Sequence, residues 1–235
     1  MLRTAVANIH NDRLWWRKVL IGGALSCTIF GYFFSAGLVV ENMDNTRRGY
    51  PTPLPPWADW STRFLIGLFA SLIDFLFYLL PWLLALMIFF CVAIGLLVAQ
   101  IDGVGNQLAL VIVATLLLYM TTMFLSSVSA VGRLILIDDS SPERAMSGHT
   151  LREALRPAVR GAYFRARLIA LPAYLPFLLM LGLTIFVGQY AFDGIWPLLL
   201  ICIWLTLAAL LYGQLIVGQV YAMTEQMIGG VMPRE

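Results

Sequence analysis

The fold of this chain is decided by residues 64–99, which read FLIGLFASLIDFLFYLLPWLLALMIFFCVAIGLLVA. As one helix this stretch would be about 54 Å long, whereas about 20 apolar residues already cross the hydrocarbon core of a bilayer. Four further apolar stretches of similar character flank it. They cover residues 19–40, 108–132, 168–192 and 195–222. The pattern predicts an all-α, polytopic helical membrane protein.

The composition supports the same class. Of the 235 residues, 60% are hydrophobic and only 12% are charged, and the mean hydropathy is +0.84. Soluble domains carry about a quarter charged residues. We therefore expect a single integral membrane domain over residues 1–235. The net charge of +2 gives no reason to expect nucleic acid as a partner.

Pro81 divides the longest stretch, because proline removes a backbone donor and clashes with the preceding helical turn. Polar or small residues recur before it every three or four positions and would form a stripe on one helical face. We expect either an amphipathic interfacial helix over 60–80 followed by a span over 82–99, or a tight hairpin. The number of crossings is thus five or six. The stripe consists of Arg63, Gly67, Ser71, Asp74 and Tyr78.

An internal similarity suggests duplication. Residues 80–84 read LPWLL and residues 175–179 read LPFLL, each after an amphipathic stretch. This pattern indicates pseudo-repeats over 19–99 and 108–192, with an extra C-terminal helix over 195–222. The match is weak in identity and stronger in layout.

Lysine and arginine are distributed unevenly among the polar segments. Residues 133–167 contain seven arginines, whereas the short loops at 100–107 and 193–194 contain no lysine or arginine. The positive-inside rule places connector 133–167 and the C-terminus in the cytoplasm and the two loops outside. The sides of the N-terminus and of connector 41–63 stay open. If the two repeats have the same orientation, the first helix must either start outside or enter the membrane and return to the side from which it came.

The first connector carries a distinctive block. Gly37 and Asn42 precede the sequence PLPPWADW at residues 53–60, and Gly67 follows it. This arrangement resembles an uncharacterised prokaryotic family of multi-pass membrane proteins, domain of unknown function 4013, which has a Pro-Leu-Pro-x-Trp signature. The run before Gly37 is shorter than the family pattern. The resemblance implies an integral fold of about six helices in the prokaryotic inner membrane, and it implies no activity.

The proline block itself predicts a stiff elbow, because prolines hold the backbone extended and cannot continue a helix. Two tryptophans would dock the following helix at the membrane interface. The alternative is a proline-aromatic surface that a partner subunit grips. Its residues are Pro53, Pro55, Trp57 and Trp60.

Few residues offer chemistry. Asp74 is the strongly ionisable residue well inside an apolar stretch, where it either handles a proton or cation or belongs to the interfacial stripe. Glutamines near helix ends extend a candidate intramembrane polar site. That site comprises Asp74, Gln189, Gln214 and Gln219.

Histidine is confined to His10 and His149, both outside the apolar stretches, so no span offers an axial ligand for haem or bacteriochlorophyll. No metal-ligand spacing or catalytic motif occurs, and we expect neither a cofactor nor an enzymatic activity. Arg152, Arg156 and Arg160 recur every four residues, which would place three guanidinium groups on one helical face. They either snorkel to headgroups or bind anionic lipid or an acidic partner surface.

We therefore expect a non-enzymatic integral membrane subunit, structural or accessory, within a larger membrane complex. Its partners would be membrane lipids and other membrane protein subunits. The alternative is a small transporter or channel-like protein with a pathway between duplicated halves.

Overall fold

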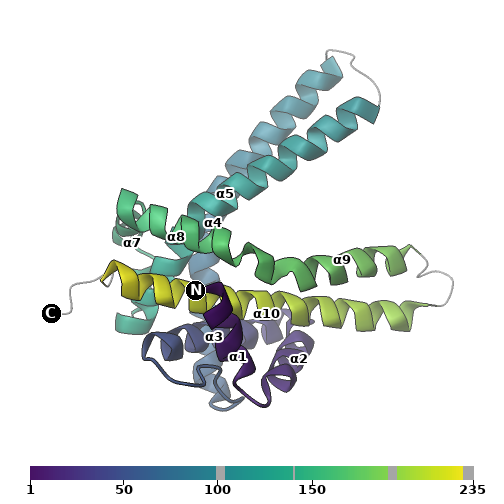
Figure 1. Cartoon of the computed structure of the whole chain (residues 1–235). Helices are drawn as coiled ribbons and strands as arrows, with labels where there is room; N and C mark the ends of the chain where they lie inside the picture. Colours follow the sequence, from purple (N-terminus) through teal and green to yellow (C-terminus); the bar gives the residue numbers. More distant parts are fainter. Residues whose placement is uncertain (99–103, 140, 190–194, 230–235) are drawn as a thin grey trace.

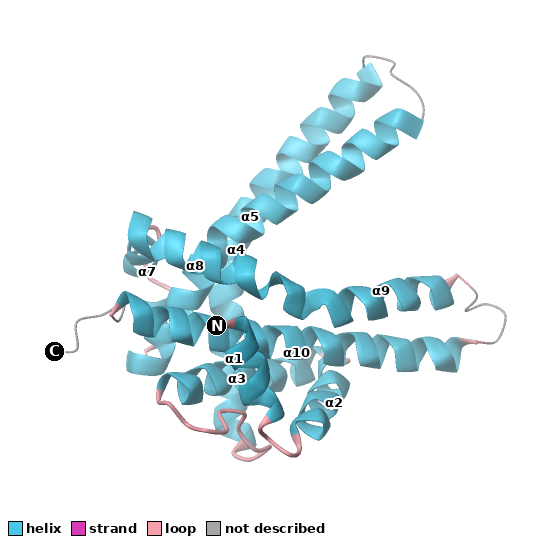
Figure 2. Cartoon of the chain, viewed as in Figure 1, coloured by secondary structure: helices cyan, strands magenta, loops and turns pink. Residues whose placement is uncertain are grey.

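The computed structural model describes residues 1–98, 104–139, 141–189 and 195–229, and every regular element among them is helical (Figure 2). The short 3₁₀ helix η1 covers Leu171–Tyr174. The α-helices are α1 (Leu2–His10), α2 (Trp15–Ser26), α3 (Ile29–Arg47), α4 (Trp60–Val98), α5 (Val104–Asp139), α6 (Pro142–Ala145), α7 (Gly148–Ala154), α8 (Pro157–Ala170), α9 (Leu175–Gly188) and α10 (Trp196–Ile228).

The helices form a base and two arms that extend from it in diverging directions (Figure 1). The first arm is the antiparallel pair of residues 75–98 of α4 and 104–122 of α5. The second arm pairs α9 with residues 196–210 of α10. The base contains α1, α2, α3, α6, α7 and α8 together with the remaining parts of α4, α5 and α10. Both ends of the described chain lie at the base.

Three helical runs among the described residues are long and apolar enough to cross a membrane: Trp60–Leu96, Pro157–Gly188 and Trp196–Ile228. Their arm segments expose large apolar side chains, such as Phe90 at 54% and Leu179 at 74%. The prediction of an all-α chain with long apolar helices is confirmed. The predicted five to six spans are not confirmed, since three runs of the described chain are long and apolar enough to cross a membrane.

The first apolar stretch does not form the single helix that was expected over 19–40. Helix α2 ends at Ser26, and the backbone of Thr28 is extended before α3 begins. The Thr28 hydroxyl accepts a hydrogen bond from the Gly31 amide at 3.0 Å and so caps α3. A Cβ at Gly31 would lie 2.0 Å from the Leu25 carbonyl oxygen, so this tight turn requires glycine there.

The expected interruption at Pro81 is also wrong. Helix α4 runs without a break from Trp60 to Val98 and contains Pro81 in its interior. A proline removes one hydrogen bond from a helix, and long apolar helices tolerate that loss. Neither the division into 60–80 and 82–99 nor a hairpin within this stretch occurs. The duplication over 19–99 and 108–192 stays a prediction.

Helix α3 lies between α4 and α10 and touches α4 backbone to backbone. A Cβ added to Gly67 would lie 1.7 Å from the Phe33 carbonyl oxygen, and one added to Gly37 would lie 2.2 Å from the Arg63 carbonyl oxygen. The two glycines therefore permit a contact between α3 and α4 that no other residue could make.

We predict that Gly67→Ala destabilises the protein, because the added methyl group must push α3 and α4 apart. Overpacking of this kind costs about 1–3 kcal/mol, measurable as a lower Tm in detergent. Gly95→Ala on the same helix is the matched control, since a Cβ there meets nothing within 4 Å. Equal Tm values for the two variants would contradict the close contact.

Candidate functional site

The polar side chains of the base converge on the last turns of α3. This part of the chain reads ENMDNTR at residues 41–47 and continues the helix beyond the apolar stretch, where a loop was expected. Each of its main polar residues reaches a different part of the protein.

Glu41 binds Arg63 at the start of α4. The Arg63 guanidinium donates to both carboxylate oxygens, with Nη2 at 2.5 Å from Oε2 and Nε at 3.1 Å from Oε1. It also donates to the Pro56 carbonyl oxygen at 2.7 Å and lies 5.1 Å from the centre of the Trp57 ring. Arg63 is only 2% exposed. A two-pronged ion pair of this kind fixes the direction in which α4 leaves the base.

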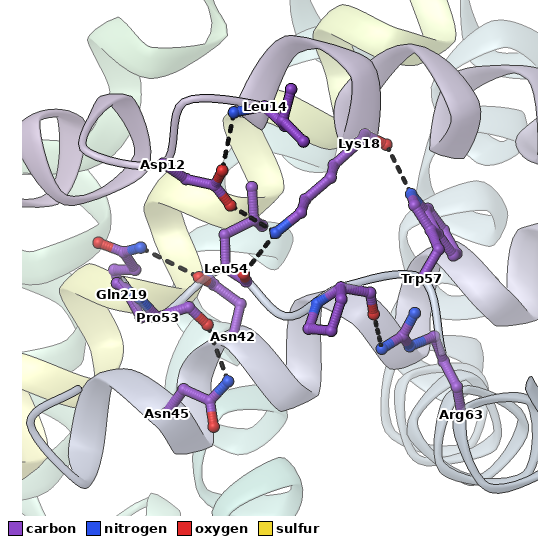
Figure 3. Close-up of polar contacts among 11 residues, drawn as sticks. Asp12, Leu14, Lys18, Asn42, Asn45, Pro53, Leu54, Trp57, Arg63 and Gln219 are labelled. Carbon is purple, nitrogen blue, oxygen red and sulfur yellow. Dashed lines mark hydrogen bonds and ion pairs between the residues drawn. The ribbon is translucent and has the colours of Figure 1, made fainter. Parts of the chain in front are cut away.

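The proline block is held by the helices around it (Figure 3). The Trp57 indole donates to the Lys18 carbonyl oxygen at 3.2 Å, and the Lys18 ammonium donates to the Leu54 carbonyl oxygen at 2.8 Å and pairs with Asp12. Asn45 donates to the Pro53 carbonyl oxygen at 2.9 Å. The block thus links α2, α3 and α4, as the elbow interpretation predicts.

Burial decides which part of the block a partner could reach. Pro53 and Pro55 are buried, whereas Trp60 is 45% exposed and stacks on the half-buried Trp57 at 5.4 Å. Only the tryptophan side of the predicted partner surface therefore remains accessible. Pro53 and Pro55 instead belong to the packing of the base.

Asn42 and Gln219 join α3 to α10 through amide hydrogen bonds. The Gln219 amide donates to Asn42 Oδ1 at 3.0 Å, and Asn42 donates to the Leu215 carbonyl oxygen at 3.0 Å. Both side chains are 0% exposed. Gln219 therefore has a partner on another helix, as expected of amides that fasten helices in membranes.

Arg47 completes this set of contacts at the end of α3. Its guanidinium lies 2.5 Å from Asp138 of α5 and 3.6 Å from Glu225 of α10. Gln226 donates to the Arg47 carbonyl oxygen at 2.8 Å. One residue thus ties α3 to the base ends of two long helices.

Asp74 has partners as well. Ser129 donates to Asp74 Oδ1 at 2.7 Å, and Arg133 donates to Oδ2 at 2.5 Å. Both partners lie on α5, where the first arm joins the base. The carboxylate that was singled out as an isolated charge is therefore neutralised across the α4–α5 pair.

Two of the four residues of the predicted polar site share a neighbour, because Asp74 and Gln214 both interact with Tyr32 of α3. Asp74 joins α4 to α5, Gln219 joins α3 to α10, and Gln214 lies beside Tyr32 of α3. Gln189 is exposed at the end of α9, far along the second arm. Asp74 and Gln214 thus lie around Tyr32, whereas Gln219 is bound to Asn42 and Gln189 lies at the far end of the second arm.

A polar cavity of about 280 Å³ lies between the elbow and α3. Its described lining contains the carboxylates of Glu41, Asp44 and Asp59 but no serine, cysteine, lysine or histidine. No group of three or more metal-ligating side chains occurs among the described residues. The lining residues are Glu41, Asp44, Asn45, Pro55, Pro56, Ala58, Asp59 and Arg63.

The arginine series does not share one helical face, because α7 ends at Ala154 and α8 begins at Pro157. Arg152 lies on α7, Arg156 is the N-cap of α8, and Arg160 lies within α8. All three are exposed, and Arg156 pairs with Glu153 at 2.7 Å. Proline at the first position of α8 sets this break. A role in binding lipid or a partner stays a prediction.

The sequence analysis missed most of the hub, which is the set of polar residues at 41–47 of α3 together with their partners. Glu41 and Arg47 were read as members of a loop, and Arg133 as a topology signal. A usable signal was present, because polar residues at 41, 42, 45 and 46 follow the apolar stretch at helical spacing. The distant partners of Glu41 and Asn42, which lie 22 and 177 residues away along the chain, were not readable from the sequence.

We predict that Arg63→Lys lowers the stability of the protein by about 1–3 kcal/mol, because an ammonium group cannot replace the two-pronged contact with Glu41 and the bond to Pro56 together. Thermal unfolding in detergent measures the loss. Arg48→Lys is the control, since Arg48 is exposed and pairs with Asp44. If both variants unfold at the wild-type temperature, Arg63 does not hold the elbow.

We also predict that Asp74→Asn destabilises the α4–α5 contact by about 2 kcal/mol, because it leaves the Arg133 charge without its partner. The double variant Asp74→Asn with Arg133→Gln should recover most of that loss. A double-mutant cycle measures the coupling. Additive losses would show that the two side chains do not interact.

Comparison with known proteins adds a family to this geometry. Residues 20–187 match the family described as "Protein of unknown function (DUF4013)". No curated protein and no solved structure matches the chain. The matched region contains the glycine contacts, the elbow and both sides of the Asp74–Arg133 pair, and the match confirms the resemblance seen in the PLPPW block. The chain belongs to the DUF4013 family.

Proposed function

We propose that the chain is a non-enzymatic integral membrane subunit, structural or accessory, of a larger assembly in the prokaryotic inner membrane. The observation that carries the proposal is the pair of diverging, apolar arms (Figure 1). Exposed apolar surface of this extent marks contact with lipid or with other proteins.

The arms have the length and surface of membrane hairpins. Residues 75–98 of α4 span about 36 Å as a helix, which exceeds the 30 Å of a hydrocarbon core. Helix α5 packs against α4 and carries the apolar stretch 108–132, so we assign it as the second crossing of the first arm. The runs Pro157–Gly188 and Trp196–Ile228, which contain the second arm, add two crossings, so the chain crosses the membrane four times.

The charges favour one orientation. Residues 100–107 and 193–194 contain no lysine or arginine, whereas residues 133–167 contain seven arginines. The positive-inside rule then places the base in the cytoplasm and the arm ends outside. Helix α8 fits the boundary, because Arg160 and Arg165 precede the exposed Leu168 and Ile169 along it.

The arrangement of the polar residues favours a subunit over a transporter. A transport pathway needs helices packed around it and polar groups facing it. Here the arms diverge, and Asp74 and Gln219 are engaged in contacts between neighbouring helices. The polar groups therefore serve assembly of the base, and the uncovered arm surfaces remain for contact with other chains.

The first arm also has a groove for a neighbouring helix. A cavity of about 450 Å³ lies on the α4–α5 pair, and its surface is almost entirely apolar. The lining includes the small residues Ala85 and Ala114. Small residues allow transmembrane helices to approach closely. We assign its occupant as a transmembrane helix of another subunit. The groove is lined by Trp82, Leu83, Ala85, Leu86, Phe89, Ala114 and Leu117.

A photo-crosslinking amino acid at Leu86 tests this function in the native membrane. Leu86 is 50% exposed beside the groove, and Met227, which is 73% exposed at the base, is the matched control position. We expect a protein adduct from position 86 that co-purifies with the chain in mild detergent as one large complex. A chain that purifies as a free monomer and forms adducts with lipid alone would contradict the subunit role and favour the transporter alternative.

A further inference from the structure

We infer that α2 and α3 form a re-entrant hairpin, which enters the membrane from the side of the base and turns back within it. The tip of the hairpin, residues 27–30, then contacts the acyl chains of lipids. This inference rests on the membrane embedding of the two arms proposed above. It does not depend on whether the chain is a subunit of a larger complex.

The lengths of the two helices exclude a full crossing by either apolar part. Helix α2 has 12 residues, about 18 Å at 1.5 Å per residue, which is little more than half of the hydrocarbon core. Helix α3 has 19 residues, but its last seven are the polar sequence ENMDNTR. Each apolar helix therefore reaches only part of the way into a bilayer.

Both ends of the hairpin lie together. Lys18, at the start of the apolar stretch, donates to the carbonyl oxygen of Leu54, which follows α3. The Trp57 indole in turn donates a hydrogen bond to the Lys18 carbonyl oxygen (Figure 3). A segment whose two ends are joined by hydrogen bonds has not carried the chain across a membrane.

The tip lies beside a membrane helix. A Cβ on Gly23 of α2 would lie 2.6 Å from Ala208 of α10, and the Trp204 indole donates to the Leu20 carbonyl oxygen at 2.9 Å. These contacts place Leu20 and Gly23, in the middle of α2 and within two turns of the tip, next to the apolar half of α10. If α10 crosses the membrane, residues 27–30 lie within the bilayer as well.

The side chains at the tip are suited to hydrocarbon. Ile29 is 80% exposed and Phe30 is 72% exposed, among the highest values of any large apolar residue in the described chain. In water these two neighbours would form an isolated apolar projection. Surrounded by acyl chains, they continue the apolar surface of the arms.

The turn satisfies much of its own backbone, as a bend in a membrane must. The Thr28 hydroxyl donates to the Leu25 carbonyl oxygen at 3.1 Å and accepts from the Gly31 amide. The Ser26 hydroxyl donates to the Gly22 carbonyl oxygen at 2.8 Å. Two hydroxyl side chains thus supply partners where the helical hydrogen bonding is broken.

The charges agree with a return to the same side. Arg13, Arg17 and Lys18 lie at the start of the hairpin, and Arg47 and Arg48 lie at its end. A single crossing would place one of these clusters outside, against the positive-inside rule. A re-entrant hairpin leaves both clusters on the side of connector 133–167. It also answers the question that the sequence left open, since the N-terminus and the first connector then share one side.

Cysteine accessibility tests the inference in membrane vesicles of both orientations. The variant Cys91→Ala with Cys202→Ala retains Cys27 at the tip, and single cysteines at Thr4, Thr52, Gly148 and Gln189 report the two faces. We expect an impermeant maleimide to label Cys27 only after detergent is added. Thr4→Cys and Thr52→Cys should be labelled from the same face as Gly148→Cys, and Gln189→Cys from the opposite face.

Two results would overturn the re-entrant hairpin. Labelling of Thr4→Cys and Thr52→Cys from opposite faces would show a full crossing, and labelling of Cys27 in intact vesicles would place the tip in water. Labelling of Gly148→Cys and Gln189→Cys from one face would instead contradict the embedding of the arms. The failure of the hairpin and the failure of the proposed membrane function are thereby distinguishable.

Discussion

The structure depends on the ion pair between Glu41 and Arg63 and on the neighbouring polar contacts at the end of α3. Apolar packing in the core of the base is non-directional, so the directions of the helices come from hydrogen bonds and close contacts. Glu41 fixes α4, Asn42 fixes α10, and Arg47 reaches α5. One short segment of α3 thereby sets the positions of three long helices.

Close backbone contact makes this hub possible. Gly37 and Gly67 let α3 and α4 touch, which brings Glu41 within reach of Arg63 one turn further along α3. Gly22 and Gly23 allow the same closeness between α2 and α10. Helix α3 contacts both α4 and α10, the helices from which the two diverging arms extend (Figure 1).

The sequence predicted what depends on local composition and missed what depends on distant partners. Helical class, apolar length and the elbow at residues 53–57 were readable, because apolar runs and prolines act on the backbone nearby. The break at Thr28 was missed since a capping hydroxyl inside an apolar run looks like a tolerated polar residue. Pro81 led to the opposite error, a predicted break that is absent. The packing of α4 against α5 outweighs the local cost of the proline.

The same reasoning explains why Asp74 suggested a site and the structure gives a fastener. A lone carboxylate in an apolar stretch is costly unless it has a partner, and the sequence does not reveal a partner 59 residues away. Ser129 and Arg133 lie one helical turn apart on α5, so one face of that helix supplies both a hydroxyl and a charge. The pair sits where the first arm meets the base, and its charges cancel before the apolar surface begins. A membrane hairpin can thus be anchored at its root by polar contacts while its length remains free to meet lipid or another chain.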